Sequence, residues 1–215
     1  MGEIFDWIDN RFGIRQPHRK FLHRDIPEGV NYSFCLGGAA LVCFIMLFLS
    51  GIMLSIYYVP SETEAFNSIV RINNEVRLGW FIRSFHKWSS NLLIISIILH
   101  TIRVFIYKAY RSPRELNWVA GSLTLVIVFA SGFTGYLLPW DQKAYWATEV
   151  GTSMAKTIPI IGKYLLYLVR GGEDVTGTTL IRFYAMHIIY LPSCLFILLW
   201  AHFHMVRKQG IKGGL

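Results

Sequence analysis

The stretch FYAMHIIYLPSCLFILLWAHFHMV, residues 183–206, contains no aspartate, glutamate, lysine or arginine. A helix crosses the hydrocarbon core of a bilayer with about 20 apolar residues, so this run is long enough. Two further charge-free runs cover 29–61 and 116–140. A fourth run, 78–107, is charge-free only from 88 to 102 and spans if its flanking cations snorkel. Because backbone groups inside lipid must bond internally, the runs predict an all-α, integral membrane four-helix bundle.

Composition and charge agree with a membrane protein. Hydrophobic residues make up 53% of the 215 residues and charged residues 16%, against about 25% charged in a soluble domain. The net charge of +8 comes from cations flanking the apolar runs, which the positive-inside rule explains without a nucleic-acid partner. The N-terminal segment, the connection between the second and third helices and the tail are all cation-rich. We therefore expect both termini on the negative, cytoplasm-like side.

These features divide the chain into three expected parts. An N-terminal segment, 1–31, lies on the negative side, and a tail covers 209–215. Between them a membrane domain, 32–208, holds spans at about 32–58, 78–107, 116–138 and 180–207. The segment 141–179 is too long for a bare connection. Its apolar groups predict short helices lying along the membrane surface.

Four histidines form the strongest constellation in the sequence. His86 and His100 lie fourteen residues apart in the second span, and His187 and His202 lie fifteen apart in the fourth. On an α-helix these steps fall about 40° short of full turns or about 60° beyond them, over about 21–22 Å of axis. Because the two spans run in the same direction, His86 is predicted to lie level with His187, and His100 with His202.

Two histidines at each level indicate heme iron rather than zinc. Zinc needs four ligands at one point, whereas heme iron takes two axial ligands from opposite sides. Polar side chains in lipid are unfavourable, so four of them in two matched levels are hard to explain as packing residues. Filling both axial positions leaves no site for dioxygen. The sequence therefore predicts electron transfer through two hemes b, held between the second and fourth helices near opposite membrane surfaces.

Arginines and glycines recur at the same two levels. Each histidine has an arginine three or five residues away on its water side, where a guanidinium can bind a heme propionate: Arg83, Arg103, Arg182 and Arg207. Glycines on the first and third spans repeat at the fourteen-residue step: Gly37, Gly51, Gly121 and Gly135. We expect these glycines to let a porphyrin edge approach the two helices that donate no ligand.

Four motifs give the chain a resemblance to a known family. They are Arg-Ser-Phe-His at 83–86, Ser-Pro-Arg-Glu-Leu at 112–116, Gly-Tyr-Leu-Leu-Pro-Trp-Asp-Gln at 135–142 and Arg-Lys-Gln-Gly at 207–210. Together with the four histidines, they make essentially the whole chain similar to the cytochrome b6 family. That family is the amino-terminal half of cytochrome b from quinol-oxidising bc and b6f complexes. The four expected helices match its split form, in which a separate subunit supplies the second half.

The resemblance implies a part in a proton-translocating Q-cycle. Quinol oxidised on the positive side would send one electron to a Rieske iron–sulfur protein and the other across the membrane through the two b hemes. The enzyme would be a quinol:cytochrome c or quinol:plastocyanin oxidoreductase, and this subunit would be inactive alone while contributing to both quinone sites. The resemblance places part of the quinol-oxidation pocket at Trp140, Asp141, Gln142 and Tyr145.

The resemblance also implies partners and a third heme. The partners are a subunit IV-like chain with the Pro-Glu-Trp-Tyr motif that this sequence lacks, the Rieske protein and a c-type cytochrome subunit, in a dimeric complex. Cys35 resembles the family cysteine that forms one thioether to a heme c on the negative side. Cys43 and Cys194 are expected to be ordinary small buried residues.

Two other functions fit part of the sequence. One is a di-heme membrane anchor of a hydrogenase or formate dehydrogenase, and the other is a transporter whose histidines relay protons. Lys87 stands where plant and cyanobacterial family members usually have arginine. The stretch 135–141 resembles Gram-positive, menaquinol-oxidising relatives, so the resemblance favours a bacterial plasma membrane over a thylakoid. No pattern specifies the quinone, the electron acceptor, or a bound chlorophyll or carotenoid.

Overall fold

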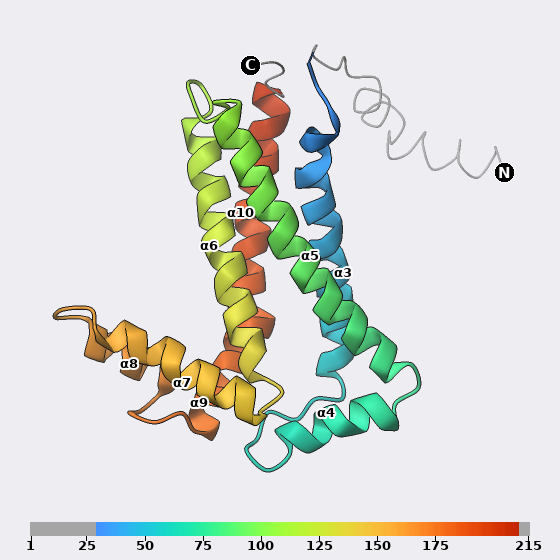
Figure 1. The fold of residues 1–215 in the computed structure, drawn as a ribbon, viewed down its shortest axis with the longest axis vertical. Helices are drawn as coiled ribbons and strands as arrows, with labels where there is room; N and C mark the ends of the chain where they lie inside the picture. The colour runs from blue at the N-terminus through green and yellow to red at the C-terminus, as the bar shows by residue number, and fades with distance from the viewer. Residues whose placement is uncertain (1–28, 211–215) are drawn as a thin grey trace, which may run out of the picture.

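The computed structural model describes residues 29–210, so most of the predicted N-terminal segment and tail lies outside the described residues. All regular elements within this range are helical. Within residues 29–210, four helices are long and apolar enough to cross a membrane, as the charge-free runs predicted: Tyr32–Ser55, Gly79–Ile106, Glu115–Leu137 and Gly177–Gln209. Figure 1 shows these four spans side by side.

The first three spans are nearly uninterrupted α-helices, and the fourth is composite. The first comprises a 3-10 turn, η1 (Tyr32–Cys35), followed by α3 (Leu36–Ser55). The second and third are α5 (Gly79–Ile106) and α6 (Glu115–Leu137). The fourth runs through α9 (Gly177–Ala185), a wide π turn named η2 (Met186–Tyr190) and α10 (Leu191–Gln209).

Three shorter helices gather with α9 at one end of the bundle, which we call the loop-rich end (Figure 1). They are α4 (Ala65–Asn74), α7 (Gln142–Lys156) and α8 (Gly162–Arg170). The last two confirm the short helices expected in 141–179, whereas α4 was not anticipated. The opposite end of the bundle holds the start of α3 and the end of α10.

The spans pack as two pairs. Helix α3 lies along α5, and α6 lies along α10, while α5 and α6 make few contacts with each other. Aromatic side chains join the pairs near mid-membrane, where the Phe196 ring of α10 packs edge-on against Phe44 and Phe48 of α3 at centroid distances of 5.3 and 5.0 Å. The surrounding core draws on all four spans: Ala40, Cys43, Phe44, Leu93, Ile97, Val128 and Leu195. The pairs thus meet at the centre of the membrane domain.

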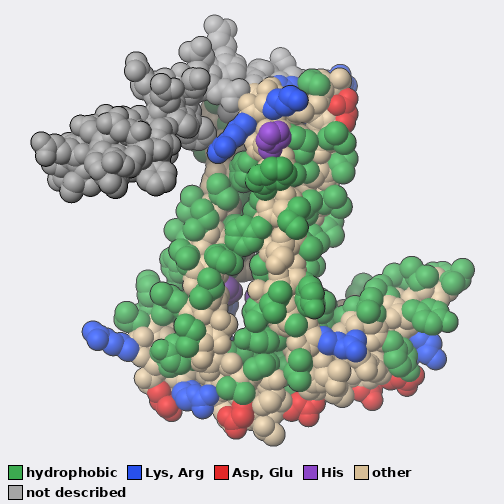
Figure 2. All heavy atoms as spheres, turned by 180° about the vertical axis from the view of Figure 1, so that it is seen from behind, with side chains coloured by type: hydrophobic (Ala, Val, Ile, Leu, Met, Phe, Trp, Pro, Cys, Tyr) green, Lys and Arg blue, Asp and Glu red, His purple; other side chains and the backbone are tan. Residues whose placement is uncertain are grey.

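The outer face of the bundle is apolar. Figure 2 shows hydrophobic side chains over its middle, with charged side chains gathered toward its two ends. Large residues such as Ile197 and Trp200 of α10 are mostly exposed, which is unfavourable in water but expected for side chains that face lipid. The surface therefore agrees with four spans in a bilayer.

Candidate functional site

The histidines of the second and fourth spans meet in two levels. His86 and His100 lie on α5, His202 lies on α10, and His187 lies in the π turn η2. Near the loop-rich end, the ring centroids of His86 and His187 are 6.3 Å apart, with an angle of 69° between the ring planes. At the opposite end, His100 and His202 line one cavity of about 250 Å³. Each level thus takes one histidine from each helix pair, in the expected pairing.

The spacing of the first level fits one metal ion between two rings. A metal–imidazole bond is about 2 Å long, and each ring centre lies about 1 Å further out. One metal between two coaxial rings therefore separates the centroids by about 6 Å. The distance of 6.3 Å between His86 and His187 matches this arrangement. Among the described residues no group of three or more His, Cys, Asp or Glu side chains could hold a metal ion.

Helix α6 orients both histidines of the fourth span. His187 Nδ1 lies 2.9 Å from the Ser131 carbonyl oxygen, and His202 Nδ1 lies 3.2 Å from the Asn117 carbonyl oxygen. A carbonyl only accepts hydrogen bonds, so each Nδ1 carries the proton and donates it. The Nε2 lone pair of each ring is then free for a metal, which is the usual arrangement of a ligating histidine.

A serine performs the same task for His86. Ser50 Oγ lies 2.9 Å from His86 Nδ1 and donates its own hydrogen to the Met46 carbonyl at 2.7 Å. Because the hydroxyl has only one hydrogen, it accepts from His86 Nδ1. The Nε2 atom of His86 is therefore also free to ligate.

His100 differs from the other three. Its Nδ1 lies 3.2 Å from the Arg103 guanidinium, which can only donate, so this contact puts the ring proton on Nε2. Binding a metal through Nε2 requires the other tautomer, in which Nδ1 is protonated and repels the guanidinium. Metal ligation at His100 would thus release Arg103 for an anionic partner.

The four expected glycines each touch a histidine ring. A Cβ added to Gly135 would lie 2.6 Å from His187 Cε1, and one added to Gly37 would lie 3.0 Å from His100 Cε1. At Gly51 and Gly121 the distances to the facing histidines are both 3.3 Å. Normal contacts between carbon atoms are about 3.5–4.0 Å, so a side chain at any of these positions would displace the ring. In this structure the glycines therefore leave room for the histidine rings, whereas the sequence suggested that they leave room for a porphyrin edge.

The cavity around His100 and His202 contains unsatisfied polar atoms. Arg103 Nε, Arg114 Nε and Asn117 Oδ1 are buried and have no hydrogen-bond partner within the described range, and all three residues line the cavity. Buried orphan donors favour a ligand, and two guanidinium groups favour an anionic one. Two histidines, a glycine cradle and two arginines fit a heme with its carboxylates. Sequence reasoning missed Arg114, although it lies within the quoted motif at 112–116.

The other expected arginines have different surroundings. Arg83 donates to Asn73 Oδ1 at 3.4 Å. Arg182 donates to the carbonyl oxygens of Tyr167 and Leu168 at 3.2 and 2.6 Å, and so binds the carboxyl-terminal turn of α8. Arg207 lies in the last turn of α10. Of the four arginines, only Arg103 lines the cavity between the histidines.

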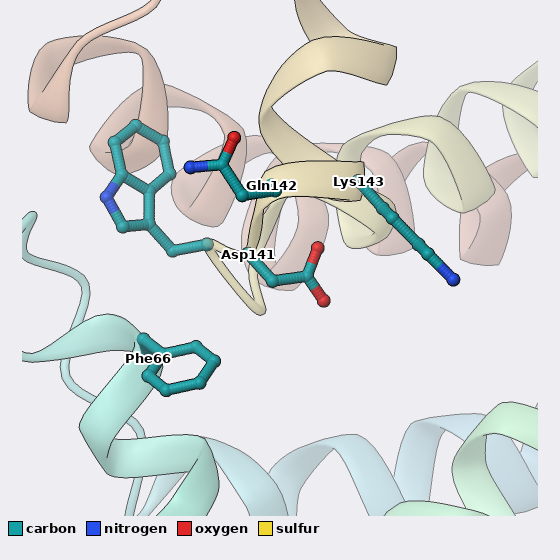
Figure 3. Close-up of a pocket in the computed structure, with 5 residues that line it drawn as sticks. Phe66, Asp141, Gln142 and Lys143 are labelled. Carbon is teal, nitrogen blue, oxygen red and sulfur yellow. The ribbon is translucent and has the colours of Figure 1, made fainter.

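A second cavity, of about 520 Å³, opens at the loop-rich end (Figure 3). Trp140, Asp141 and Gln142 line it as expected, together with Lys143. Phe66 of α4 faces them across the cavity (Figure 3). No sequence signal pointed to Phe66, because the wall that it forms depends on where α4 folds. The sequence therefore anticipated one side of this cavity.

The start of α7 is held in place by two contacts. Asp141 caps the helix, since its Oδ1 accepts the Ala144 N–H at 2.8 Å. Tyr145, expected in the pocket, is not among the residues that line the cavity, and its ring packs edge-on against Trp140 and Trp146 at 5.9 and 5.2 Å. Tyr145 thus supports the residues that line the cavity.

One buried arginine joins the helices of the loop-rich end. Arg170, at the end of α8, is 2% exposed and forms a salt bridge of 3.0 Å with Glu149 of α7. Its Nε donates to Thr152 Oγ1 at 2.6 Å, and its Nη2 donates to Ser153 Oγ at 2.9 Å. The Arg170 carbonyl accepts from Thr179 of α9 at 2.8 Å. This network joins α7, α8 and α9 at the loop-rich end.

The three cysteines, all within the described residues, do not line the cavity of His100 and His202. Cys35 is exposed and ends the 3-10 turn before α3, at the end of the bundle that holds His100. Cys43 is buried, as expected. Cys194 is exposed, so the expectation that it is buried was wrong. The reason is its place on α10, three residues before the exposed Ile197 on the same outer face.

Comparison with known proteins supplies an independent line of evidence. The family model described as Cytochrome b/b6/petB matches residues 21–210. Cytochrome b6 of Prochlorococcus marinus is 43% identical over 212 residues, which cover 99% of this chain and 97% of that protein. Cytochrome b6 of Acaryochloris marina is 42% identical over 215 residues, all of both chains.

A solved structure agrees with these relatives. A chain of the "Hyperthermophilic respiratory Complex III" matches with a TM-score of 0.89 and 32% sequence identity. The match covers 97% of this chain and 56% of that one, so this chain spans little more than half the length of its structural neighbour.

Proposed function

The chain belongs to the cytochrome b/b6 family, and from that premise we propose that it is the cytochrome b6-type subunit of a quinol-oxidising, bc-type complex. Its task in a proton-translocating Q-cycle is to carry electrons from a quinol-oxidation pocket on the positive side to the negative side of the membrane. Two hemes b, each with histidines as both axial ligands, supply one-electron transfer when bound.

One observation carries the proposal. His86 and His187 come from different helix pairs, have ring centroids 6.3 Å apart, and have hydrogen-bond acceptors at both Nδ1 atoms. A packing role would not require free Nε2 atoms on opposing rings at the distance that one iron needs. His100 and His202, again one from each helix pair, line the cavity of the other level.

Each level would use its own polar residues. At the level of His100 and His202, Arg103 and Arg114 line the cavity with unpaired Nε atoms, which suits two propionates. At the level of His86 and His187, Arg83 is the propionate candidate on α5, and Arg182 would have to leave the carbonyl groups of α8 to join it. For Arg207 the role rests on its position in the last turn of α10.

The cavity at the start of α7 is the proposed part of the quinol-oxidation pocket. Phe66 and Trp140 provide apolar walls, and Asp141 and Gln142 provide polar groups, a combination that suits an apolar ring with hydroxyl groups. The pocket is incomplete in this chain, because the proton-accepting Pro-Glu-Trp-Tyr motif is absent from the sequence. A subunit IV-like partner would supply that motif, and a Rieske protein and a c-type cytochrome would accept the electrons, in a dimeric complex.

A third heme is part of the proposal. Cys35 is exposed at the end of the bundle that holds His100, where a thioether to a heme c would not compete with the histidine sites. A thioether survives denaturation and histidine ligation does not. The wild-type chain should therefore keep a heme stain on a denaturing gel, Cys35→Ser should lose it, and Cys194→Ser, which changes another exposed cysteine, should keep it.

The proposed membrane arrangement follows from the cations. The end of the bundle with Lys108, Arg111 and Arg114 would face the negative side, and the loop-rich end would face the positive side. The membrane would be a bacterial plasma membrane, with a thylakoid as the alternative.

A reduced-minus-oxidised spectrum of the purified chain tests the core of the proposal. A b-type band from two hemes per chain is expected, and its absence would refute the heme sites and favour a proton-relay transporter. Replacing either His100 or His202 should remove the same spectral component, and replacing either His86 or His187 should remove the other. If His86→Ala instead resembled His202→Ala, the pairing would be wrong. A di-heme anchor would give the b-type band without covalent heme or quinol oxidation in the assembled complex.

A further inference from the structure

The fourth span contains one wide turn at the position of a proposed ligand. In η2 (Met186–Tyr190) the Leu191 N–H donates to the Met186 carbonyl, five residues earlier, instead of four residues earlier as in an α-helix. It is the only π turn within residues 29–210. Wide turns of this kind insert one extra residue into a helix without breaking it.

A proline explains why the helix widens here. Pro192 follows η2 by two residues, in the first turn of α10. In a regular α-helix its ring would collide with the carbonyl of Ile188, and that carbonyl would lose its donor. A turn with hydrogen bonds to the fifth residue shifts the carbonyl groups relative to the ring, so the helix continues through the proline.

The extra residue also solves a spacing problem. Ser131 and Asn117 of α6, whose carbonyl groups accept from His187 and His202, lie fourteen residues apart, as do His86 and His100 on the opposing helix. His187 and His202 lie fifteen apart. In a regular helix the additional residue would rotate His187 by about 100°, which moves a ring at about 5–6 Å from the axis by about 8–9 Å. His187 would then lose both Ser131 and His86.

We propose that the π turn Met186–Tyr190 is a register device that absorbs the fifteenth residue, so that His187 and His202 match the fourteen-residue step of the three other spans. His187 is placed by this turn, and the residues of the turn act as positioning residues. The inference rests on the proposed function only because bound heme reports where the histidines lie.

Two single-residue deletions test the device. Removing Ile189 takes one residue from the wide turn, and removing Ile95 takes one from regular helix between His86 and His100. The two isoleucines are matched, being 55% and 53% exposed. Both deletions are made in the variant Pro192→Ala, so that a regular turn can form without a proline clash, and Pro192→Ala alone is the control.

The readout is the number of b-type hemes per chain, from absorbance and from low-spin electron paramagnetic resonance signals. Pro192→Ala and its Ile189 deletion should each hold two hemes, because the deletion closes the turn into regular helix at the fourteen-residue step. The Ile95 deletion should lose about half of the b-type absorbance, because α5 has no wide turn and the deletion shortens the step between His86 and His100 to thirteen residues.

The device is refuted if the Ile189 deletion loses heme as the Ile95 deletion does, or if the Ile95 deletion keeps both hemes. Failure of the Ile189 deletion to accumulate in membranes, when Pro192→Ala accumulates, would refute it equally. A wild-type chain without any b-type band would instead overturn the proposed function, so the two failures are distinguishable.

Discussion

Replacing Gly135 with alanine should remove one of the two hemes. The added Cβ would lie 2.6 Å from His187 Cε1 and 3.1 Å from both ring nitrogens, whereas ordinary carbon contacts are about 3.5–4.0 Å. The ring must therefore withdraw from α6 by about 1 Å. The hydrogen bond of 2.9 Å from His187 Nδ1 to Ser131 would stretch toward 4 Å and be lost, since a separation of about 3.6 Å is already too long for a hydrogen bond.

The magnitude follows from the loss of an orienting hydrogen bond. Removing such a partner of a ligating histidine typically weakens metal binding about 10–100-fold. Gly135→Ala should accordingly retain the heme of His100 and His202 and lose most of the other, leaving about half of the b-type absorbance per chain. Redox titration of the purified protein identifies the missing component, which should be the one removed by His187→Ala.

A matched substitution on the same helix controls for helix packing. A Cβ at Gly132, three residues earlier on α6, would meet only Ile94 Cδ1, at an ordinary 3.7 Å. Gly132→Ala should therefore keep both hemes. Equal heme content in Gly135→Ala and Gly132→Ala would show that the close approach of Gly135 does not govern ligation, and the reasoning from contact distance would fail.

Three further predictions concern other contacts. Ser50→Ala removes the hydroxyl that accepts from His86 Nδ1. Heme binding at that level should weaken by about tenfold, and the midpoint potential of that heme should rise, because the ring becomes a poorer electron donor. An unchanged redox titration would contradict this prediction. Phe66→Ala should raise the KM for quinol of the assembled complex by roughly fivefold, equivalent to about 1 kcal/mol of aromatic contact. The heme spectrum should stay unchanged. A changed heme spectrum with an unchanged KM would contradict this prediction. Arg170→Met should lower the free energy of unfolding of the purified protein. Breaking a buried ion pair typically costs about 3–5 kcal/mol, and we expect a loss near the lower figure because the Glu149 side chain is still 29% exposed. Glu149→Gln, which can keep the hydrogen bonds, should lower thermal stability less than Arg170→Met does, as measured by circular dichroism. Equal losses of stability in the two variants would argue against the ion pair.

The spans and the histidine levels could be predicted because each depends on local spacing. Charge-free runs define helices in lipid whatever their neighbours are, and the step from His86 to His100 fixes the face of one regular helix. The step from His187 to His202 was read with regular geometry, which leaves the two rings about 60° apart. If the wide turn at Met186–Tyr190 absorbs one residue as proposed, this step becomes that of His86 and His100, about 40° short of full turns, and periodicity alone could not reveal it.

Other parts of the site depend on tertiary packing and could not be predicted from the sequence. Phe66 enters the second cavity because α4 folds beneath the bundle, and the ten residues of α4 were read only as a connection. Arg114 reaches the cavity of His100 from the connection before α6, whereas the expected arginines were sought on the histidine helices. The Tyr145 ring packs against Trp140 and does not line the cavity, a tertiary contact that the sequence motif does not specify.

The division of the bundle into two helix pairs bears on how the protein is made in the cell. Helices α3 and α5 contact each other closely, and so do α6 and α10, yet each histidine level joins one pair to the other. A chain with only its first three spans in the membrane presents His86 and His100 without opposing ligands. Both missing ligands arrive together with the fourth span. If the two levels hold hemes as proposed, neither heme site could be completed before the fourth span is inserted, so heme would bind only after all four spans are in the membrane.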